Sequence, residues 1–329
     1  MVSFPDGKFT PGAVRKSRDN EQLSDDPVTQ LSLGEQDILD RLGGRESQKV
    51  FGTFTRQLGS VIVADEIGVD ASVVHPERAR LQRFFKRLTA EGDKAFDADR
   101  DAFADSITAG KEAFWSAITD VEVTRVGEPF FTTGEGFAVF DKKIKDPTLY
   151  PPKAQVLIKE QVATLLDHGV VVTMNDSHDL SDEDTMKLKE TTNGLYAQVF
   201  FGLLYSPYLE SDGYDRAQDR FVASVLAFQY VDDVLDAGGD ALEGSANLLN
   251  AVAEDMGEST SLRHALNAQA QLDVSDVSRE RIVSYCKSVQ DAAPRSYEKI
   301  LSRQRELLEI ASLPSEIFQQ LTLPDGEQK

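Results

Sequence analysis

The chain contains 329 residues and carries a formal net charge of -21, with 56 acidic residues against 35 basic ones. This acidity argues against nucleic acid or an anionic membrane surface as the main partner, although it leaves room for an anionic substrate held by a metal ion. The single cysteine, Cys286, excludes an intrachain disulfide and a thiolate metal cluster, and neither a long apolar span nor a signal-peptide pattern occurs. We therefore expect a soluble, cytoplasmic protein with no stable membrane insertion.

In chain order, residues 1–34 are polar and without periodicity, which predicts a flexible arm. Apolar residues then recur at helical spacing, which predicts a single all-α domain over 35–323 with many antiparallel helices, followed by a polar tail over 324–329. Glycines and β-branched residues in 120–152 predict a loop with some extended structure. The expected helices cover about 48–69, 77–90, 99–119, 153–175, 182–204, 215–238, 244–256, 260–268, 277–291 and 293–311.

The segment 58–70, LGSVIVADEIGVD, places carboxylates on the apolar face of a predicted helix. Asp65 and Glu66 continue its apolar stripe, and Asp70 lies one turn beyond Glu66. An ionised carboxylate in an apolar interior needs a cationic partner or a metal ion. For this segment alone, a buried ion pair, a helix end that reaches solvent and a metal site all remain open.

Two further charged segments follow. The predicted helix over 77–90 is basic and carries Arg78 and Arg80. After it, four aspartates at helical spacing flank an apolar stripe rather than interrupting it, and we interpret them as a solvated face. They are Asp93, Asp97, Asp101 and Asp105.

The most informative segment is 221–236, FVASVLAFQYVDDVLD, in which an apolar helical pattern runs into three aspartates. Steps of three and four along the helix lead from Phe228 to Asp232 and Asp236, which predicts that the stripe facing the core ends in these two carboxylates and that they point the same way. Carboxylate oxygens are the ligands that Mg²⁺ prefers. Two such helices therefore favour a shared magnesium site.

The half of the chain from about 160 to 260 resembles the trans-prenyl diphosphate synthases of the class I isoprenoid synthase fold. The segment 228–240, FQYVDDVLDAGGD, is similar to that family's second motif, FQ-x-x-DD-x-x-D-x-x-GD. NDSHDL at 175–180 stands where the family has GQ-x-x-DL, and KLKET at 187–191 stands where it has a Lys-Thr pair. The acids at 65–70 resemble an altered form of its first motif, DD-x-x-D.

The resemblance implies a helical bundle with a central active-site cavity, Mg²⁺ as cofactor and an allylic prenyl diphosphate as substrate. The implied metal ligands are Asp65, Glu66, Asp70, Asp232, Asp233 and Asp236. The implied catalytic residues are Asp232, Asp233 and Lys189. The implied substrate contacts are Asp179, Lys189, Gln229, Asp240, Arg78 and Arg80.

The implied function is that of a Mg²⁺-dependent prenyl diphosphate synthase or prenyltransferase that ionises its substrate to a carbocation and works as a homodimer. Two alternatives remain open. A single-substrate class I terpene synthase is favoured because the family's acceptor-site arginines are matched only by GGRE at 43–46 and loosely by Arg78 and Arg80. A non-catalytic homologue that serves as a regulatory or binding subunit is favoured by the altered first motif.

Overall fold

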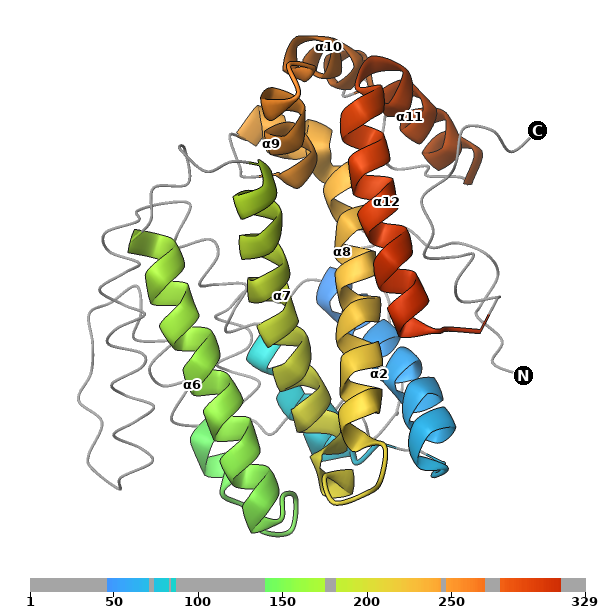
Figure 1. Cartoon of the computed structure of the whole chain (residues 1–329). Coiled ribbons are helices and arrows are strands. Elements are labelled where there is room, and N and C mark those ends of the chain that lie inside the picture. The colour runs from blue at the N-terminus through green and yellow to red at the C-terminus, as the bar shows by residue number, and fades with distance from the viewer. Residues whose placement is uncertain are drawn as a thin grey trace, which may run out of the picture. The chain divides into compact units, whose positions relative to one another are not determined.

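The computed structural model describes residues 46–70, 74–82, 84–86, 140–174, 182–243, 247–269 and 279–314 (Figure 1). Of these residues 85% are helical and none lies in a strand, which confirms the all-α class. No helix in this part of the chain is long and apolar enough to cross a membrane. The predicted arm over 1–34, the helix over 99–119, the aspartates at 93–105 and the tail over 324–329 lie outside the described residues.

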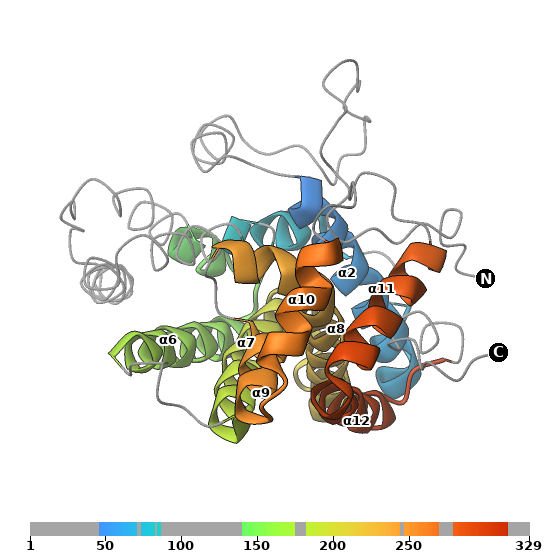
Figure 2. The same cartoon turned by 90° about the horizontal axis from the view of Figure 1, so that it is seen from above.

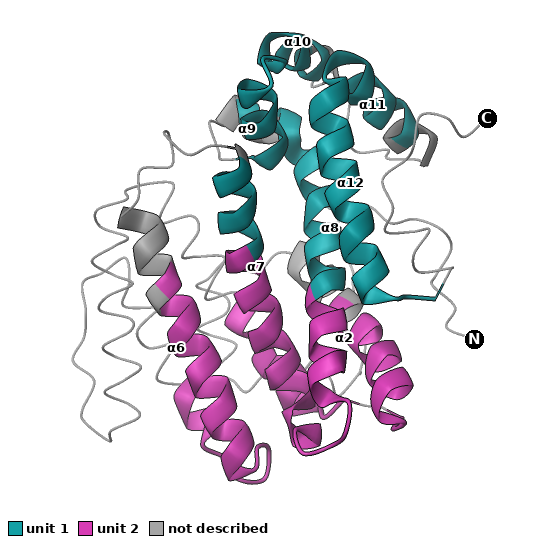
Figure 3. Ribbon diagram, in the orientation of Figure 1, with its two compact units in different colours: residues 1–19, 179–190, 223–329 teal, residues 20–178, 191–222 magenta. Residues whose placement is uncertain are grey.

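The chain divides into two compact units (Figure 3). Unit 1 contains residues 1–19, 179–190 and 223–329, and unit 2 contains residues 20–178 and 191–222. The division falls inside two long helices, α7 (Asp182–Tyr205) and α8 (Tyr214–Glu243). Each of these helices therefore contributes one part to each unit.

Unit 2 is built around large buried aromatic side chains. Its helices include α2 (Glu46–Ile67), α6 (Pro152–Met174), the second part of α7, the short η2 (Ser206–Tyr208) and the first part of α8, and residues 76–82, 84–86 and 140–144 are also helical. The ring of Phe201 lies 5.1 Å from that of Tyr205 and 5.3 Å from those of Tyr214 and Phe221. All four side chains are almost fully buried, so burial of aromatic surface stabilises this unit.

Unit 1 combines the rest of α7 and α8 with four further helices (Figures 1 and 2). These are α9 (Leu248–Asp255), α10 (Ser259–Gln269), α11 (Arg279–Ala292) and α12 (Pro294–Ala311). α9 contacts α10 and α12, and α11 contacts the same two helices. α12 begins with Pro294 and ends at Ala311, and the next residue, Ser312, caps it in the left-handed region with φ of 47°.

Most helix bounds predicted from periodicity agree with the structure to within two residues. α8 is longer than expected because Gly238 lies inside the helix, where it faces the side chain of Leu266. α9 begins later than expected because the side chain of Asn247 caps it at that point. Of the predicted loop over 120–152, residues 140–144 are helical and 120–139 lie outside the described part.

Candidate functional site

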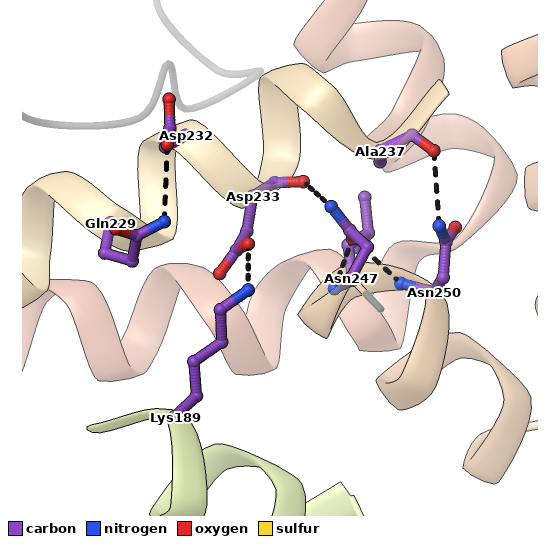
Figure 4. A network of polar contacts seen from close by, with 8 residues as sticks. Lys189, Gln229, Asp232, Asp233, Ala237, Asn247 and Asn250 are labelled. Carbon is purple, nitrogen blue, oxygen red and sulfur yellow. Dashed lines mark hydrogen bonds and ion pairs between the residues drawn. The ribbon is translucent and has the colours of Figure 1, made fainter. Parts of the chain in front are cut away.

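The second aspartate motif lies on the part of α8 that belongs to unit 1, together with the first part of α7 (Figure 4). The ammonium of Lys189 on α7 forms an ion pair with Oδ1 of Asp233 on α8. The two residues are 44 positions apart in the chain. The structure thus brings the lysine of KLKET and a carboxylate of FQYVDDVLD into direct contact.

Enclosure differs among the three aspartates of this motif. The side chain of Asp233 is only 6% exposed, whereas Asp232 is half-buried and Asp236 is exposed. The expectation that Asp232 and Asp236 continue the buried stripe is therefore wrong. The buried stripe instead passes through Tyr230, Asp233 and Ala237, which are spaced three and four residues apart and so share one face of the helix.

Asp232 and Gln229 interact one turn apart on α8. The side-chain amide of Gln229 donates to Oδ2 of Asp232 at 3.3 Å (Figure 4). Asp232 as a whole is half-buried. The carboxylate oxygens of Asp232 are of the kind that a hard divalent cation takes.

Three side chains from other helices hold this turn of α8 by its backbone carbonyls. The amide of Asn247 donates to the carbonyl of Asp233 at 2.8 Å, and the amide of Asn250 donates to that of Ala237 at 3.2 Å (Figure 4). The hydroxyl of Tyr285 donates to the carbonyl of Val234 at 2.9 Å. These contacts fix the position of the Asp233 turn against α9 and α11.

Sequence reasoning missed these three residues. Asn247 had a usable signal, because an Asn directly before an apolar run is a typical helix N-cap. Its side-chain oxygen accepts from the backbone N–H groups of Leu249 and Asn250. Its second role, as a donor to α8, has no local sequence signal.

A second polar network holds the α7 segment that carries Lys189. The next residue, Glu190, accepts from the guanidinium of Arg303 at 2.7 and 2.9 Å and from the hydroxyl of Tyr230 at 2.5 Å. Burial raises the pKa of Glu190, but the hydrogen bonds from Arg303 and Tyr230 outweigh it and lower the pKa below its ordinary value. Glu190 is therefore an ionised anchor between α7, α8 and α12.

The first aspartate motif lies in unit 2, at the end of α2, where it is paired with arginines. Nη1 of Arg220 lies 2.6 Å from Oδ2 of Asp65 and 2.5 Å from Oε1 of Glu66, and Nε of Arg216 lies 2.9 Å from Oε2 of Glu66. Hydrogen bonds from Arg220 and Arg216 lower the pKa of Glu66. Two of the interpretations left open for this segment are observed. Glu66 forms a largely enclosed ion pair with Arg220, and the helix end reaches solvent, since Asp65 is 67% exposed and does not continue the buried stripe, and Asp70 is exposed beyond the helix end.

Both arginines predicted to contact substrate are engaged within unit 2. The guanidinium of Arg78 donates to the carbonyl of Leu149 at 3.0 Å and lies 5.8 Å from the ring centroid of Tyr150. Arg80 forms a salt bridge with Glu77 at 2.7 Å. Asp179 lies outside the described residues, and Asp240 is helical near the end of α8, with its side chain outside the described part.

The chemistry of the donors on α8 suits a hard divalent cation, because Asp232 and Asp233 offer carboxylate oxygens. Across the described ranges, however, no three His, Cys, Asp or Glu side chains are grouped so that they could hold a metal ion. Cationic side chains lie against the carboxylates instead, Lys189 at Asp233 and Arg220 at Asp65 and Glu66. Comparison with family models, with curated proteins and with solved structures gives no significant match.

Proposed function

We propose that this protein is a Mg²⁺-dependent enzyme that acts on an allylic prenyl diphosphate, with the diphosphate bound at the Asp233 turn of α8. The observation that carries the proposal is the contact between Lys189 and Asp233. It joins an ammonium group that suits a phosphate with carboxylates that suit a divalent cation. These are the two partners that a metal–diphosphate complex requires.

Asp232, Asp233 and Asp236 are the carboxylates proposed to hold Mg²⁺, and Asp233 and Asp236 would have to turn toward Asp232, because in the described ranges the three are not grouped as a metal site. The cation would neutralise the diphosphate and stabilise the departing pyrophosphate. Lys189 would donate to a phosphate oxygen, since its ammonium has three donors on a flexible stem. Asn247, Asn250 and Tyr285 would keep the aspartate turn in place through the backbone carbonyls of α8.

The test is a product assay with labelled farnesyl and geranylgeranyl diphosphate, each with and without isopentenyl diphosphate. In the double variant Asp232→Asn/Asp236→Asn, we expect turnover to fall by about a hundredfold or more, because the metal ligands are lost. Asp219→Asn is the matched control, since Asp219 is exposed on the same helix outside the motif. Turnover that survives in the double variant would contradict the proposal.

The same assay separates chain elongation from single-substrate chemistry. Arg78 and Arg80 are engaged with Leu149, Tyr150 and Glu77, which favours an enzyme without an isopentenyl diphosphate site. In that case product forms from the allylic diphosphate alone, and isopentenyl diphosphate changes neither its amount nor its identity. An elongated product would instead assign the chain to the prenyl diphosphate synthases or prenyltransferases.

The second candidate function is a non-catalytic homologue that binds or regulates a partner. The pairing of Asp65 and Glu66 with Arg220 and Arg216 favours it, because these carboxylates are neutralised without a metal ion. This candidate predicts no turnover with any allylic diphosphate by the chain alone. It also predicts that a partner carrying two intact aspartate motifs changes its own turnover when this chain is added.

A further inference from the structure

Unit 2 carries a cluster of five basic side chains that neither aspartate motif uses. This basic cluster consists of Arg80, Lys142, Lys143, Lys145 and Lys159. The whole chain has 56 acidic residues against 35 basic ones. A local excess of positive charge on so acidic a protein therefore calls for a physical explanation.

The basic cluster forms where two short helical segments of unit 2 pack together. The ring of Phe85 in one segment lies 5.1 Å from the ring of Phe140 in the other. The guanidinium of Arg78 donates to the carbonyl of Leu149 at 3.0 Å. Figure 2 shows the two segments next to each other, in cyan and green. These contacts bring basic residues from distant parts of the chain onto one region of unit 2.

Asp141 is enclosed beneath two of the lysines. Its Oδ2 lies 3.0 Å from the ammonium of Lys145, and its Oδ1 lies 3.3 Å from the ammonium of Lys159. The side chain of Asp141 is 4% exposed, whereas that of Lys145 is 33% exposed. The negative charge is therefore inside and holds two cations in position, and the remaining positive charge lies nearer to the surface.

Glu77 is shared by two cations in the same way. Its Oε1 lies 2.7 Å from Nη1 of Arg80, and its Oε2 lies 3.7 Å from the ammonium of Lys143. The neighbouring Lys142 is exposed and adds a further positive charge. One carboxylate again serves two basic side chains, so it leaves a positive charge in excess.

Asp146 is the third acidic residue of this region. Its Oδ1 accepts from the hydroxyl of Thr148 at 2.6 Å and from the backbone N–H of Thr148 at 2.9 Å. These hydrogen bonds lower the pKa of Asp146, and the charges of Lys143 and His75 lower it further. Asp146 is therefore ionised at neutral pH. Five basic side chains still outnumber the three carboxylates, and the region stays positive.

We propose that the basic cluster is a docking surface for a short acidic segment of a partner protein. Opposite charge attracts such a segment, and the lysines that Asp141 holds in position lose less freedom when they bind it. A long polyanion, such as nucleic acid or an anionic membrane surface, extends past the cluster and is repelled by a chain whose net charge is -21. The surface uses no residue of the site proposed on α8, so either proposal can fail without the other.

The experiment measures the binding of a fluorescein-labelled hexaglutamate peptide to the full chain by fluorescence anisotropy. In Lys142→Glu/Lys143→Glu we expect the affinity to fall by about tenfold or more, because two attractive charges become repulsive. Arg263→Glu/Lys287→Glu is the matched control, since it changes the net charge equally at two exposed positions of unit 1. There the affinity should fall by less than about twofold, because distant exposed charges are screened.

A loss of affinity confined to the cluster variant supports the proposal. If that variant does not fold by circular dichroism, Lys142→Gln/Lys143→Gln replaces it, with Arg263→Gln/Lys287→Gln as control and the same expected direction. The proposal is overturned if the wild type does not bind hexaglutamate at low salt, or if both double variants lose affinity equally. It is also overturned if oligothymidylate or phosphatidylserine vesicles bind more tightly than the peptide and lose their binding in the cluster variant, because the partner is then a nucleic acid or a membrane.

Discussion

Asp233 and Glu66 are enclosed carboxylates that each lie against a basic side chain from another helix. In both places the charge is neutralised within one unit, by Lys189 in unit 1 and by Arg220 in unit 2. The two pairs differ in the cation. An arginine guanidinium forms several hydrogen bonds in a fixed geometry, whereas a lysine ammonium is a mobile point charge. We therefore expect the pair of Arg220 with Glu66 to be structural. The ammonium of Lys189 should leave Asp233 more readily than Arg220 leaves Glu66.

The Arg220 pair can be tested by stability. Arg220→Met leaves Glu66 enclosed without its nearest cation, so we expect the free energy of unfolding to fall by about 1–3 kcal/mol. The matched control is Arg216→Met, whose side chain is 70% exposed, and there we expect a loss below about 1 kcal/mol. Urea unfolding of both variants measures the difference. Equal losses in the free energy of unfolding of the two variants would show that the burial of the Arg220 pair adds nothing to the stability of the fold.

Glu258 provides a pH-dependent prediction in unit 1. It accepts from the backbone N–H of Ser296 at 3.0 Å and from its hydroxyl at 2.7 Å, and from Nε of Arg295 at 3.0 Å. Burial opposes its ionisation, but these hydrogen bonds outweigh burial and lower its pKa from 4.5 to about 2. A lowered folded-state pKa stabilises the fold above pH 4.5, and this contribution is lost as the pH falls toward about 2.

We expect Glu258→Gln to lower the free energy of unfolding by about 1–3 kcal/mol at pH 7. The difference from the wild type should shrink at pH 3, because Glu258 of the unfolded wild type is then protonated, and the ionised carboxylate of the folded state stabilises the fold by less than at pH 7. Urea unfolding at the two pH values is the measurement, and Glu254→Gln, at an exposed site on α9, is the control. A difference that is the same at both pH values would contradict the role of the charge.

At the scale of elements, Asn247 connects two helices by serving both at once. Its oxygen caps α9 and its amide nitrogen donates to α8. Asn247→Asp keeps the cap but places a carboxylate oxygen against the carbonyl of Asp233. We expect a loss of about 1–3 kcal/mol in the free energy of unfolding and weaker binding of the Mg²⁺–thiodiphosphate analogue complex.

The control for this variant is Asn267→Asp, at an exposed position of α10, which should change neither quantity. Unfolding by urea and calorimetric titration measure the two effects separately. If Asn247→Asp loses stability and still binds the analogue with wild-type affinity, the amide of Asn247 is structural and does not position the aspartate turn.

The packing of α2 against α7 in unit 2 depends on a glycine. A Cβ at Gly59 would lie 2.5 Å from Cε2 of Tyr205, whose hydroxyl donates to the carbonyl of Arg56. We expect Gly59→Ala to destabilise the fold by about 1–3 kcal/mol through overpacking. At Gly194 the same change meets only Cγ1 of Val222, at 3.7 Å. There we expect a gain of up to about 1 kcal/mol in thermal unfolding experiments, from helix propensity. Equal effects at the two sites would contradict this account of the packing.

Helices were predictable from the sequence because periodicity records which face of each helix is buried. α6, α7 and α12 begin and end close to the predicted residues. The partners of the carboxylates were not predictable, because Arg220 lies 155 residues from Asp65 and only the fold brings them together. The sequence also did not predict that Asp233, and not Asp232, is buried. Successive side chains on a helix point about 100° apart, so a predicted stripe that is wrong by one residue assigns the wrong carboxylate to the core.

At the scale of the whole molecule, the two acid motifs belong to different compact units, and each carries its own positive charge. With a net charge of -21, the chain repels a diphosphate unless a cation accompanies it. Any binding of an allylic diphosphate should therefore depend strictly on a divalent cation. The dependence follows from overall charge as well as from the aspartates on α8.

The most direct measurement is a calorimetric titration of the full chain with unreactive farnesyl thiodiphosphate, with and without Mg²⁺, in the wild type, Asp232→Asn and Asp219→Asn. We predict binding only with Mg²⁺, lost in Asp232→Asn and retained in Asp219→Asn, because Asp232 is a proposed metal ligand and Asp219 lies outside the motif. Absence of binding at every Mg²⁺ concentration, or binding that Asp232→Asn leaves unchanged, would contradict a diphosphate site on α8.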